Sequence, residues 1–393
     1  MYTWGANSYG QLGLGHAEDQ RIPQCADCGN KARTVRAITG GGGHSAIITD
    51  SGELLVCGQN HKGQLGLGHV LEVLTFQLCH LPGKRSVQQV SCGWDFTIIL
   101  TDNGHVLACG SNSFGQLGIS PEIKHTAEPL LIKSLNEPLI SVAAGLRHAL
   151  AVTGSGKVYQ WGTGLCTQAK RALNPHPVSV HLTAREPCLV TGLDQVSAWR
   201  VTAGSAHCAC LTDSGDVFLW GSNKHGQMCS RESFLPLPTV LDRVLFNGEK
   251  VYTLHSGWTH LIAQTESGKV FTWGRADYGQ LGRSEPTSES TDPKSNASTT
   301  KPSSPISLPS EVKELNGATQ IACGSEHNLA VVGNQVLSWG WNEHGMCGDG
   351  SLCDIYQPQP ISALQNVKPL LIGCGAGHSM AFCCLKNSEE IEG

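Results

Sequence analysis

Six histidines occupy one repeated position of this sequence and are the first candidates for chemistry. Each is the fourth residue of a Gly-x-x-His motif; they are His44, His148, His207, His260, His327 and His378. Histidines that converge on one point bind metals or transfer protons. A position that recurs with a repeat is instead spread around the fold, and Phe96 takes it once without changing the spacing. We therefore interpret these histidines as structural, each hydrogen-bonded to the backbone of its own unit.

Two other short motifs have the spacing of chemical sites but not their surroundings. Cys25-x-x-Cys28 is half of a zinc site, and no second cysteine pair follows at a usual interval. Gly154-x-Gly156-Lys157 matches part of a phosphate-binding loop, but neither a Ser or Thr nor a helix pattern follows the lysine. No local nucleophile motif is present either. We predict no catalytic residue, no metal ion and no cofactor, and hence a protein that is not a bond-making enzyme.

All of these motifs lie within a unit that is repeated along the chain. In residues 41–58 a Gly-x-x-His start leads into an apolar run, an Asp-Ser-Gly turn and a second apolar run that ends before a glycine. Both runs are too short for helices, and the turn is typical of a β-hairpin. A Gly-Gln-Leu-Gly loop follows at residues 63–66. The unit is therefore a hairpin with a glycine-rich exit loop.

Both ends of the hairpin occur seven times along the chain. The second end is an aromatic residue or cysteine followed by a glycine, and successive glycines of this motif are 53, 52, 52, 59, 53 and 66 residues apart. The chain begins with the second half of a unit at residues 1–5 and finishes with the first half at residues 375–382. A strand without a partner leaves an open edge, which closed folds avoid. The pattern predicts an all-β fold, a seven-bladed β-propeller whose last blade is closed by the N-terminal strand.

The repeats predict one domain, residues 1–386, followed by a polar tail at residues 387–393. Residues 283–310 are dominated by Ser, Thr and Pro. This composition buries too little apolar surface to offset the entropy of ordering, so we expect a disordered loop there. The fourth exit loop, residues 163–166, lacks the Gly-Gln-Leu-Gly motif. Because the motif can be lost, we interpret it as a structural turn.

Composition narrows the class of partner and the compartment. The net charge of −5 argues against binding nucleic acid, which requires a clustered basic surface. No apolar run is long enough to cross a bilayer, and no signal peptide is visible, so we expect no direct membrane insertion. The seventeen cysteines of so long a chain are then read as reduced. We expect a monomer in the cytoplasm, with the nucleus as a second compartment.

The two residues inside each Gly-x-x-His motif lie on one turn and should decorate one face of the ring. Tryptophan and arginine are the usual anchors of protein interfaces. Our candidate contacts with a partner are Trp94, Asp95, Arg147, Trp258 and Glu326. In the alternative interpretation the tryptophans only pack against neighbouring blades, and the binding face is sought on the Gly-Gln-Leu-Gly side.

The Gly-x-x-His, Asp-x-Gly, Trp-Gly and Gly-Gln-Leu-Gly series resembles the repeats of the regulator of chromosome condensation family, from Met1 to about Leu385. The resemblance implies a guanine nucleotide exchange factor that binds a small GTPase and needs no cofactor. Its departure from the family pattern is that Asp95 is the only acidic residue inside the motifs of the first five units. The alternative is a non-catalytic scaffold that binds a secretory or trafficking protein.

Overall fold

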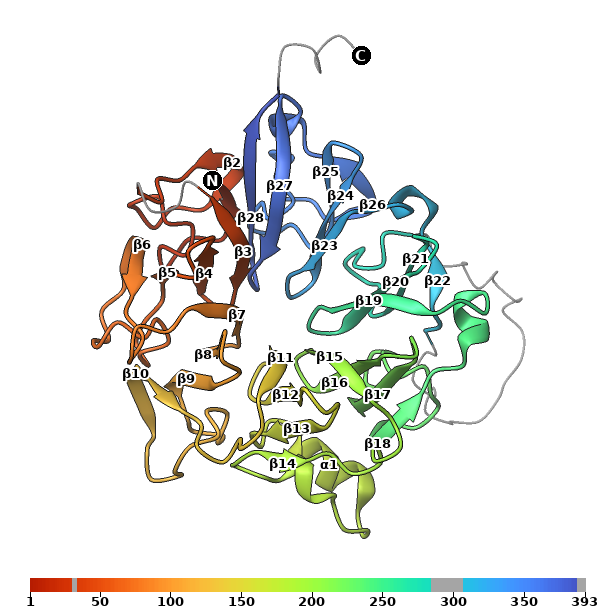
Figure 1. Cartoon of the computed structure of the whole chain (residues 1–393). Helices are drawn as coiled ribbons and strands as arrows, with labels where there is room; N and C mark the ends of the chain where they lie inside the picture. The colour runs from red at the N-terminus through yellow and green to blue at the C-terminus, as the bar shows by residue number, and fades with distance from the viewer. Residues whose placement is uncertain (30–33, 284–306, 387–393) are drawn as a thin grey trace, which may run out of the picture.

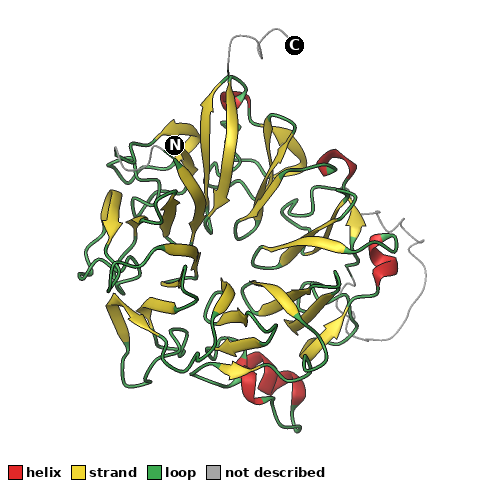
Figure 2. Ribbon diagram, viewed as in Figure 1, coloured by secondary structure: helices red, strands yellow, loops and turns green. Residues whose placement is uncertain are grey.

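The computed structural model describes residues 1–29, 34–283 and 307–386 of the chain. The strands of these residues form seven four-stranded antiparallel sheets around a central axis (Figure 1). Strands make up nearly all of the regular structure, with a few short helices at the periphery (Figure 2). The predicted all-β, seven-bladed propeller is confirmed.

Blades 1 to 3 follow one another along the chain, and each has its first strand nearest the axis. Blade 1 consists of β3 (Val35–Gly40), β4 (His44–Thr49), β5 (Leu54–Gly58) and β6 (Val73–Cys79). Blade 2 consists of β7 (Val87–Cys92), β8 (Phe96–Thr101), β9 (Val106–Ser111) and β10 (His125–Leu131). Blade 3 consists of β11 (Leu139–Ala144), β12 (Ala149–Thr153), β13 (Val158–Trp161) and β14 (Cys188–Leu189).

Blades 4 to 6 continue the same order of strands. Blade 4 consists of β15 (Ala198–Ala203), β16 (His207–Thr212), β17 (Val217–Ser222) and β18 (Phe234–Val240). Blade 5 consists of β19 (Val251–Ser256), β20 (His260–Thr265), β21 (Val270–Gly274) and β22 (Ser310–Glu311). Blade 6 consists of β23 (Gln320–Cys323), β24 (His327–Val332), β25 (Gln335–Gly340) and β26 (Ile355–Pro360).

Blade 7 is assembled from both ends of the described chain. Its strands are β27 (Val367–Cys374), β28 (His378–Leu385), β1 (Tyr2–Gly5) and β2 (Gln20–Cys25), in that order. Pairing of β1 with β28 runs from Tyr2 opposite Ala381 to Gly5 opposite His378. Figure 1 shows the red N-terminal strands beside the blue C-terminal ones. The N-terminal region thus supplies the two outer strands of the closing blade.

The exit loop without Gly-Gln-Leu-Gly is replaced by a helix, α1 (Cys166–Leu173), which the sequence reading missed. Leu165 and Ala169 at this helix are fully buried against blade 4. Gln160 compensates for the lost loop, because its side-chain oxygen accepts a 2.8 Å hydrogen bond from the Trp220 indole. The other helices within the described residues are short 3₁₀ turns: η2 (Val180–Leu182), η3 (Arg243–Phe246), η4 (Lys313–Leu315) and η5 (Ser362–Leu364).

The aromatic-Gly motif joins each blade to the preceding one. The indole nitrogens of Trp161 and Trp339 donate to the carbonyls of Gln116 and Gln280, at 2.9 and 3.0 Å, in the exit loops of the blades before. The glycine after the aromatic residue has a positive φ; Gly274, for example, is at +107°. A β-carbon there would lie 2.6 Å from a backbone carbonyl. The motif therefore needs glycine both for its conformation and for space.

Substitution of Gly274 tests this double requirement. Gly274→Ala is expected to lower the free energy of unfolding by about 3 kcal/mol or more, since strain and a backbone clash add. Gly248→Ala is the matched control, because Gly248 also has a positive φ, +79°, but nothing within 4 Å of its would-be β-carbon. Denaturant unfolding should show a loss of about 1–2 kcal/mol for the control. Equal losses in the two variants would contradict the clash.

The repeated histidines connect blades rather than stabilising their own hairpins, which corrects the prediction from sequence. Each Nε2 hydrogen-bonds an atom of the following blade: His44 to Thr97, His148 to the His207 carbonyl, His207 to Ser256, His260 to Asn328, His327 to Ser379 and His378 to Ser45. All six are fully buried. The bond from His378 to Ser45 spans the closure between blades 7 and 1, at 2.7 Å. Their role is structural, as expected, although their partners differ.

The stretch expected to be disordered, residues 283–310, lies mostly outside the described residues. Arg283 at its start hydrogen-bonds Thr272, and Ser310 at its end begins β22. Residues 284–306 and the tail at 387–393 are not part of the described structure. The predictions for these two segments remain predictions.

Candidate functional site

The Gly-x-x-His turns and the exit loops share one end of the propeller, here called the turn face. Gln59, the first residue after the aromatic-Gly motif of blade 1, donates its N–H to the Gly43 carbonyl at 2.8 Å. The Asp-Ser-Gly turns and the connections between blades lie at the other end, here called the opposite face. The two alternative binding sides considered from the sequence are therefore one surface.

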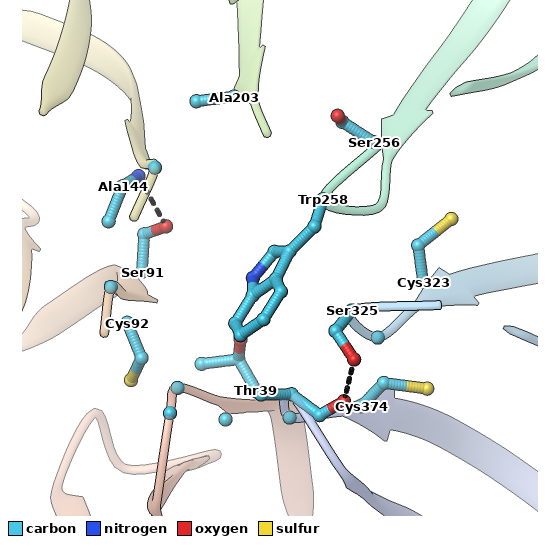
Figure 3. Close-up of a pocket in the computed structure, with 18 of the residues that line it drawn as sticks. Thr39, Ser91, Cys92, Ala144, Ala203, Ser256, Trp258, Cys323, Ser325 and Cys374 are labelled. Atoms are coloured by element: carbon cyan, nitrogen blue, oxygen red, sulfur yellow. Dashed lines mark hydrogen bonds between the residues drawn. The ribbon is translucent and has the colours of Figure 1, made fainter. Parts of the chain in front are cut away.

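The two candidate tryptophans meet across the axis of the ring. Trp94 belongs to blade 2 and Trp258 to blade 5, and their ring centroids are 5.6 Å apart at an interplanar angle of 59°. Trp94 remains 41% exposed. Figure 3 shows the Trp258 indole extending over a small axial chamber of about 150 Å³ lined by the inner strands. The pair thus covers the channel at the turn face and presents an aromatic platform there.

A ring of backbone hydrogen bonds holds this platform. In every blade the residue that follows the glycine of the Gly-x-x-His turn donates its N–H to a carbonyl of the next blade. The donors and acceptors are Gly42–Gly93, Trp94–Leu146, Leu146–Gly204, Ser205–Trp258, Trp258–Ser325, Ser325–Ala376 and Ala376–Gly41, at 2.8–3.3 Å. Because the donors are backbone groups, the ring tolerates varied side chains. It places variable residues on a rigid frame, the arrangement expected of a binding surface.

Asp95 and Arg147 lie on one side of the tryptophan pair. The Arg147 guanidinium stacks 4.5 Å from the centre of the Phe114 ring and is exposed. Burial raises the pKa of the Asp95 carboxyl, and the nearby charges of His61, Arg147 and Lys62 act against that rise. An aspartate that is partly desolvated beside cations is ready to pair with a donor from a partner.

Glu326, the remaining candidate contact, lies on the other side of the tryptophan pair and is buried. Only 7% of it is exposed, because its carboxylate accepts hydrogen bonds from the Thr259 hydroxyl at 2.7 Å and the Gln280 amide at 2.8 Å. Arg275 lies 3.9 Å away. Burial raises the pKa of Glu326, while these two hydrogen bonds and Arg275 act to lower it. Its visible role is to join the turns of blades 5 and 6.

Partly or fully exposed side chains from the exit loops also contribute to the turn face and were not predicted from the sequence. His61, Lys62 and Phe114 surround Asp95 and Arg147 as described, while Arg275 stacks 4.7 Å from the Tyr278 ring beside Glu326. All five lie between an aromatic- or Cys-Gly motif and the next Gly-Gln-Leu-Gly. That variable interval was the available signal, because it lies on the same face as the variable pair of each Gly-x-x-His turn.

Metal-binding clusters, membrane-spanning helices and disulfides are all absent from the described residues. There, no group of three or more His, Cys, Asp or Glu side chains is placed to hold a metal ion. No helix in those residues has the length and apolarity needed to cross a membrane. Cys25 and Cys28 both have free thiols, as do the other cysteines.

Known proteins share this chain's sequence and fold. The RCC1-like domain matches residues 1–381. The secretion-regulating guanine nucleotide exchange factor of Bos taurus is 54% identical over 390 residues, which cover 98% of this chain and 83% of that protein. The Mus musculus protein of the same name is 53% identical, covering 98% of this chain and 84% of that protein.

Among solved structures, Prp20p of Saccharomyces cerevisiae superposes with a TM-score of 0.83 at 22% identity, covering 100% of this chain and 92% of that one. Human WBSCR16 gives a TM-score of 0.80 at 23% identity, covering 98% and 99% of the two chains. These structural similarities show the fold alone. Together with the repeats and the sevenfold ring, the domain match establishes that this chain belongs to the RCC1-like family.

Proposed function

We propose that this protein is a guanine nucleotide exchange factor for a small GTPase and that it acts in secretion. The observation that carries the proposal is identity of 53–54%, over 98% of the chain, to proteins named for that activity. The match extends over the whole ring, since it covers 98% of this chain. The geometry adds a rigid, partly aromatic turn face of the kind that binds protein partners.

The mechanism is one of binding. A protein that binds the nucleotide-free GTPase more tightly than the nucleotide-bound form weakens nucleotide binding by the same factor. The propeller forms no bond in this cycle and requires no cofactor. Its rigidity contributes, because a preformed surface avoids the entropy cost of ordering itself around the GTPase.

We assign the GTPase to the turn face, centred on Trp94 and Trp258 and flanked by Asp95 and Arg147. The tryptophan pair supplies apolar area, and its exposed part is available to a partner. The carboxylate and the guanidinium on one side supply directional contacts. Glu326 then acts indirectly, by holding Thr259 beneath the Trp258 turn.

The test is nucleotide release. A fluorescent GDP analogue is loaded onto GTPases from each subfamily, and its release in excess GDP is followed with and without the protein. We expect at least a tenfold acceleration for members of one subfamily, equivalent to about 1.4 kcal/mol. No acceleration for any GTPase would contradict the exchange activity.

Single substitutions on the turn face should separate contact from packing. Arg147→Ala is expected to cost about 2 kcal/mol or more in affinity for the responding GTPase, since arginine is a common interface anchor. Its melting temperature should be unchanged, because Arg147 is exposed. Trp94→Ala and Trp258→Ala should also weaken binding. Titration calorimetry and thermal melts provide the two readouts.

The control for these variants is Tyr252→Ala, since Tyr252 is 59% exposed on the opposite face. It should leave exchange unaltered. If the tryptophan variants melt early while Arg147→Ala binds normally, the tryptophans have only a packing role and the GTPase contacts a different part of the surface.

A specific observation favours a second candidate, a scaffold that binds a secretory or trafficking protein without exchange. Carboxylates are scarce in the Gly-x-x-His turns: Asp95 is the only acidic residue inside these motifs in the first five units, and Glu326 in the sixth is buried. A GTPase that binds the turn face while its nucleotide is released at the uncatalysed rate would support the scaffold.

We further propose that the protein works as a monomer in the cytoplasm or the nucleus. Every cysteine has a free thiol in this structure, which suits a reducing compartment. Sedimentation of the purified protein tests the oligomeric state. Imaging of the tagged full chain tests the compartment, and accumulation in a secretory organelle would overturn this placement.

A further inference from the structure

The channel widens towards the opposite face into a second chamber, of about 530 Å³. This volume lies within the range of sites that bind ligands. Its lining includes Trp199, Arg200, Tyr252 and His255, from the inner strands of blades 4 and 5. At the turn-face end the channel narrows to the chamber of about 150 Å³ that Trp258 lines. The wider chamber therefore lies at the other end of the channel from the surface assigned to the GTPase.

β-Bulges on the inner strands shape this end of the channel. In six of these strands the register with the second strand skips one residue near the opposite face; the bulged residues are Arg36, Gln88, Ile140, Trp199, Tyr252 and Leu370. A bulge bends the strand and re-aims a side chain, and bulges are frequent beside functional sites. Ile140, Tyr252 and Leu370 are 38%, 59% and 41% exposed. Of the bulged residues, Trp199 and Tyr252 line the pocket itself. Ile140 and Leu370, here called the rim together with Tyr252, add exposed apolar side chains at the same end of their strands, whereas Arg36 and Gln88 are exposed and polar.

The charge of the pocket has one sign. No Asp or Glu lines it, whereas Arg200 does. The Arg200 guanidinium stacks 5.0 Å from the Trp199 ring, and within the described residues it forms no salt bridge. Burial, and to a lesser extent the charge of Arg200, lowers the pKa of His255 to about 4, so the imidazole is neutral at pH 7. The pocket offers one oriented, uncompensated cation within aromatic walls.

We propose that this pocket binds a short acidic segment of a partner protein, whose carboxylate pairs with Arg200 while neighbouring apolar residues cover the rim. An unpaired arginine that is held by stacking is suited to a carboxylate, because little side-chain entropy is lost on pairing. The rim selects against a small free anion, which would fill the chamber and leave Ile140, Tyr252 and Leu370 in water. An extended peptide can occupy the chamber and cover the rim residues at the same time.

The test uses a fluorescein-labelled peptide of about eight residues in which glutamate alternates with leucine and phenylalanine, long enough to span about 27 Å. Binding to the full chain is followed by anisotropy. The acidic peptide should bind, and the same peptide with lysine in place of glutamate should not. Arg200→Glu is expected to weaken binding at least tenfold, and Tyr252→Ser about fivefold.

Matched variants control for charge and for folding. Arg231→Glu makes the same change in net charge at an exposed site on an exit loop and should bind normally. Indole signals from ¹⁵N-labelled tryptophan add a direct readout, since Trp199 should shift while Trp258 does not. If Arg200→Glu unfolds early in a thermal melt, the Tyr252→Ser variant, at an exposed position, and the Trp199 indole signal still test whether the peptide binds in this pocket.

Three results would overturn the proposal. They are failure of the acidic peptide to bind, full binding by the lysine peptide or the Arg200→Glu variant, and complete competition by phenylpropionate, which indicates a site for small anions. The outcome is independent of nucleotide exchange, because Arg147→Ala should leave peptide binding intact and Tyr252→Ser should leave exchange intact.

Discussion

Removal of residues Met1–Gly5 is expected to abolish the single cooperative unfolding transition of the propeller. Strand β1 lies between β28 and β2, so its loss leaves two unpaired edges inside blade 7. Trp4 is fully buried, and its indole donates to the Met346 carbonyl at 2.9 Å. Loss of one such side chain costs about 3–5 kcal/mol, against a total stability of about 5–15 kcal/mol for a typical protein.

Calorimetry of the truncated and full chains measures this effect. Trp4→Ala should by itself lower the free energy of unfolding by about 3–5 kcal/mol. Tyr9→Ala is a nearby control that also removes an aromatic ring, but one that is 37% exposed, and it should change little. A truncated protein that melts with the full chain would show that blade 7 does not depend on β1.

The second large effect is expected on acidification, because the interblade histidines are buried in the neutral form. Burial lowers the pKa of His44, His148 and His260 to about 4, and that of His207, His327 and His378 to about 3. Between these values and the ordinary value of 6.5, the unfolded chain binds more protons than the folded one. Stability is therefore complete above about pH 6.5 and falls as the pH falls.

The size of the effect follows from the same shifts. At pH 5 each histidine withdraws about 2 kcal/mol of stability, so the six together withdraw about 12 kcal/mol. That is comparable with the whole stability of a typical protein. We expect cooperative acid unfolding near pH 5, measurable by far-ultraviolet circular dichroism during an acid titration.

His44→Phe provides the control, since Phe96 already occupies this position in blade 2. The variant loses the bond to Thr97. It also loses one proton uptake, and the slope of stability against pH should therefore decrease by about 1.4 kcal/mol per pH unit. An unchanged slope, or a wild-type protein that remains folded at pH 4, would contradict buried neutral histidines.

The fold could be predicted from the sequence because the residues that bound the strands recur in each blade. A position that requires glycine, such as Gly274 with its positive φ beside a carbonyl, is occupied by glycine in every repeat and is visible in the sequence. Helix α1 was not predicted because it occurs only once in the repeats and stands where the Gly-Gln-Leu-Gly motif is missing, without a motif of its own. The hydrogen-bond partners of the histidines were not predicted for another reason. These bonds join neighbouring blades, and so link residues about 50 positions apart, such as His44 and Thr97.

The candidate site was less predictable than the fold. A repeat places Trp94 and Trp258 at equivalent positions, but whether they touch depends on the diameter of the ring and on side-chain conformation. The burial of Glu326 was not predicted, because burial of a carboxylate depends on two donors, Thr259 and Gln280, that are distant in sequence. The bulge at Tyr252 was not predicted, since an extra residue in a strand leaves the repeat length within its normal variation.

The backbone ring around the turn face has a consequence for how the molecule opens. In a linear array of repeats an end unit can fray while the others stay folded, because each unit contacts only its neighbours. Here the bonds from Ala376 to Gly41 and from His378 to Ser45 give every blade two neighbours. No blade can unfold locally without breaking its interfaces with two neighbouring blades at the same time. The backbone amides of blade 7, which contains the chain ends, should consequently be protected from hydrogen exchange as strongly as those of any other blade.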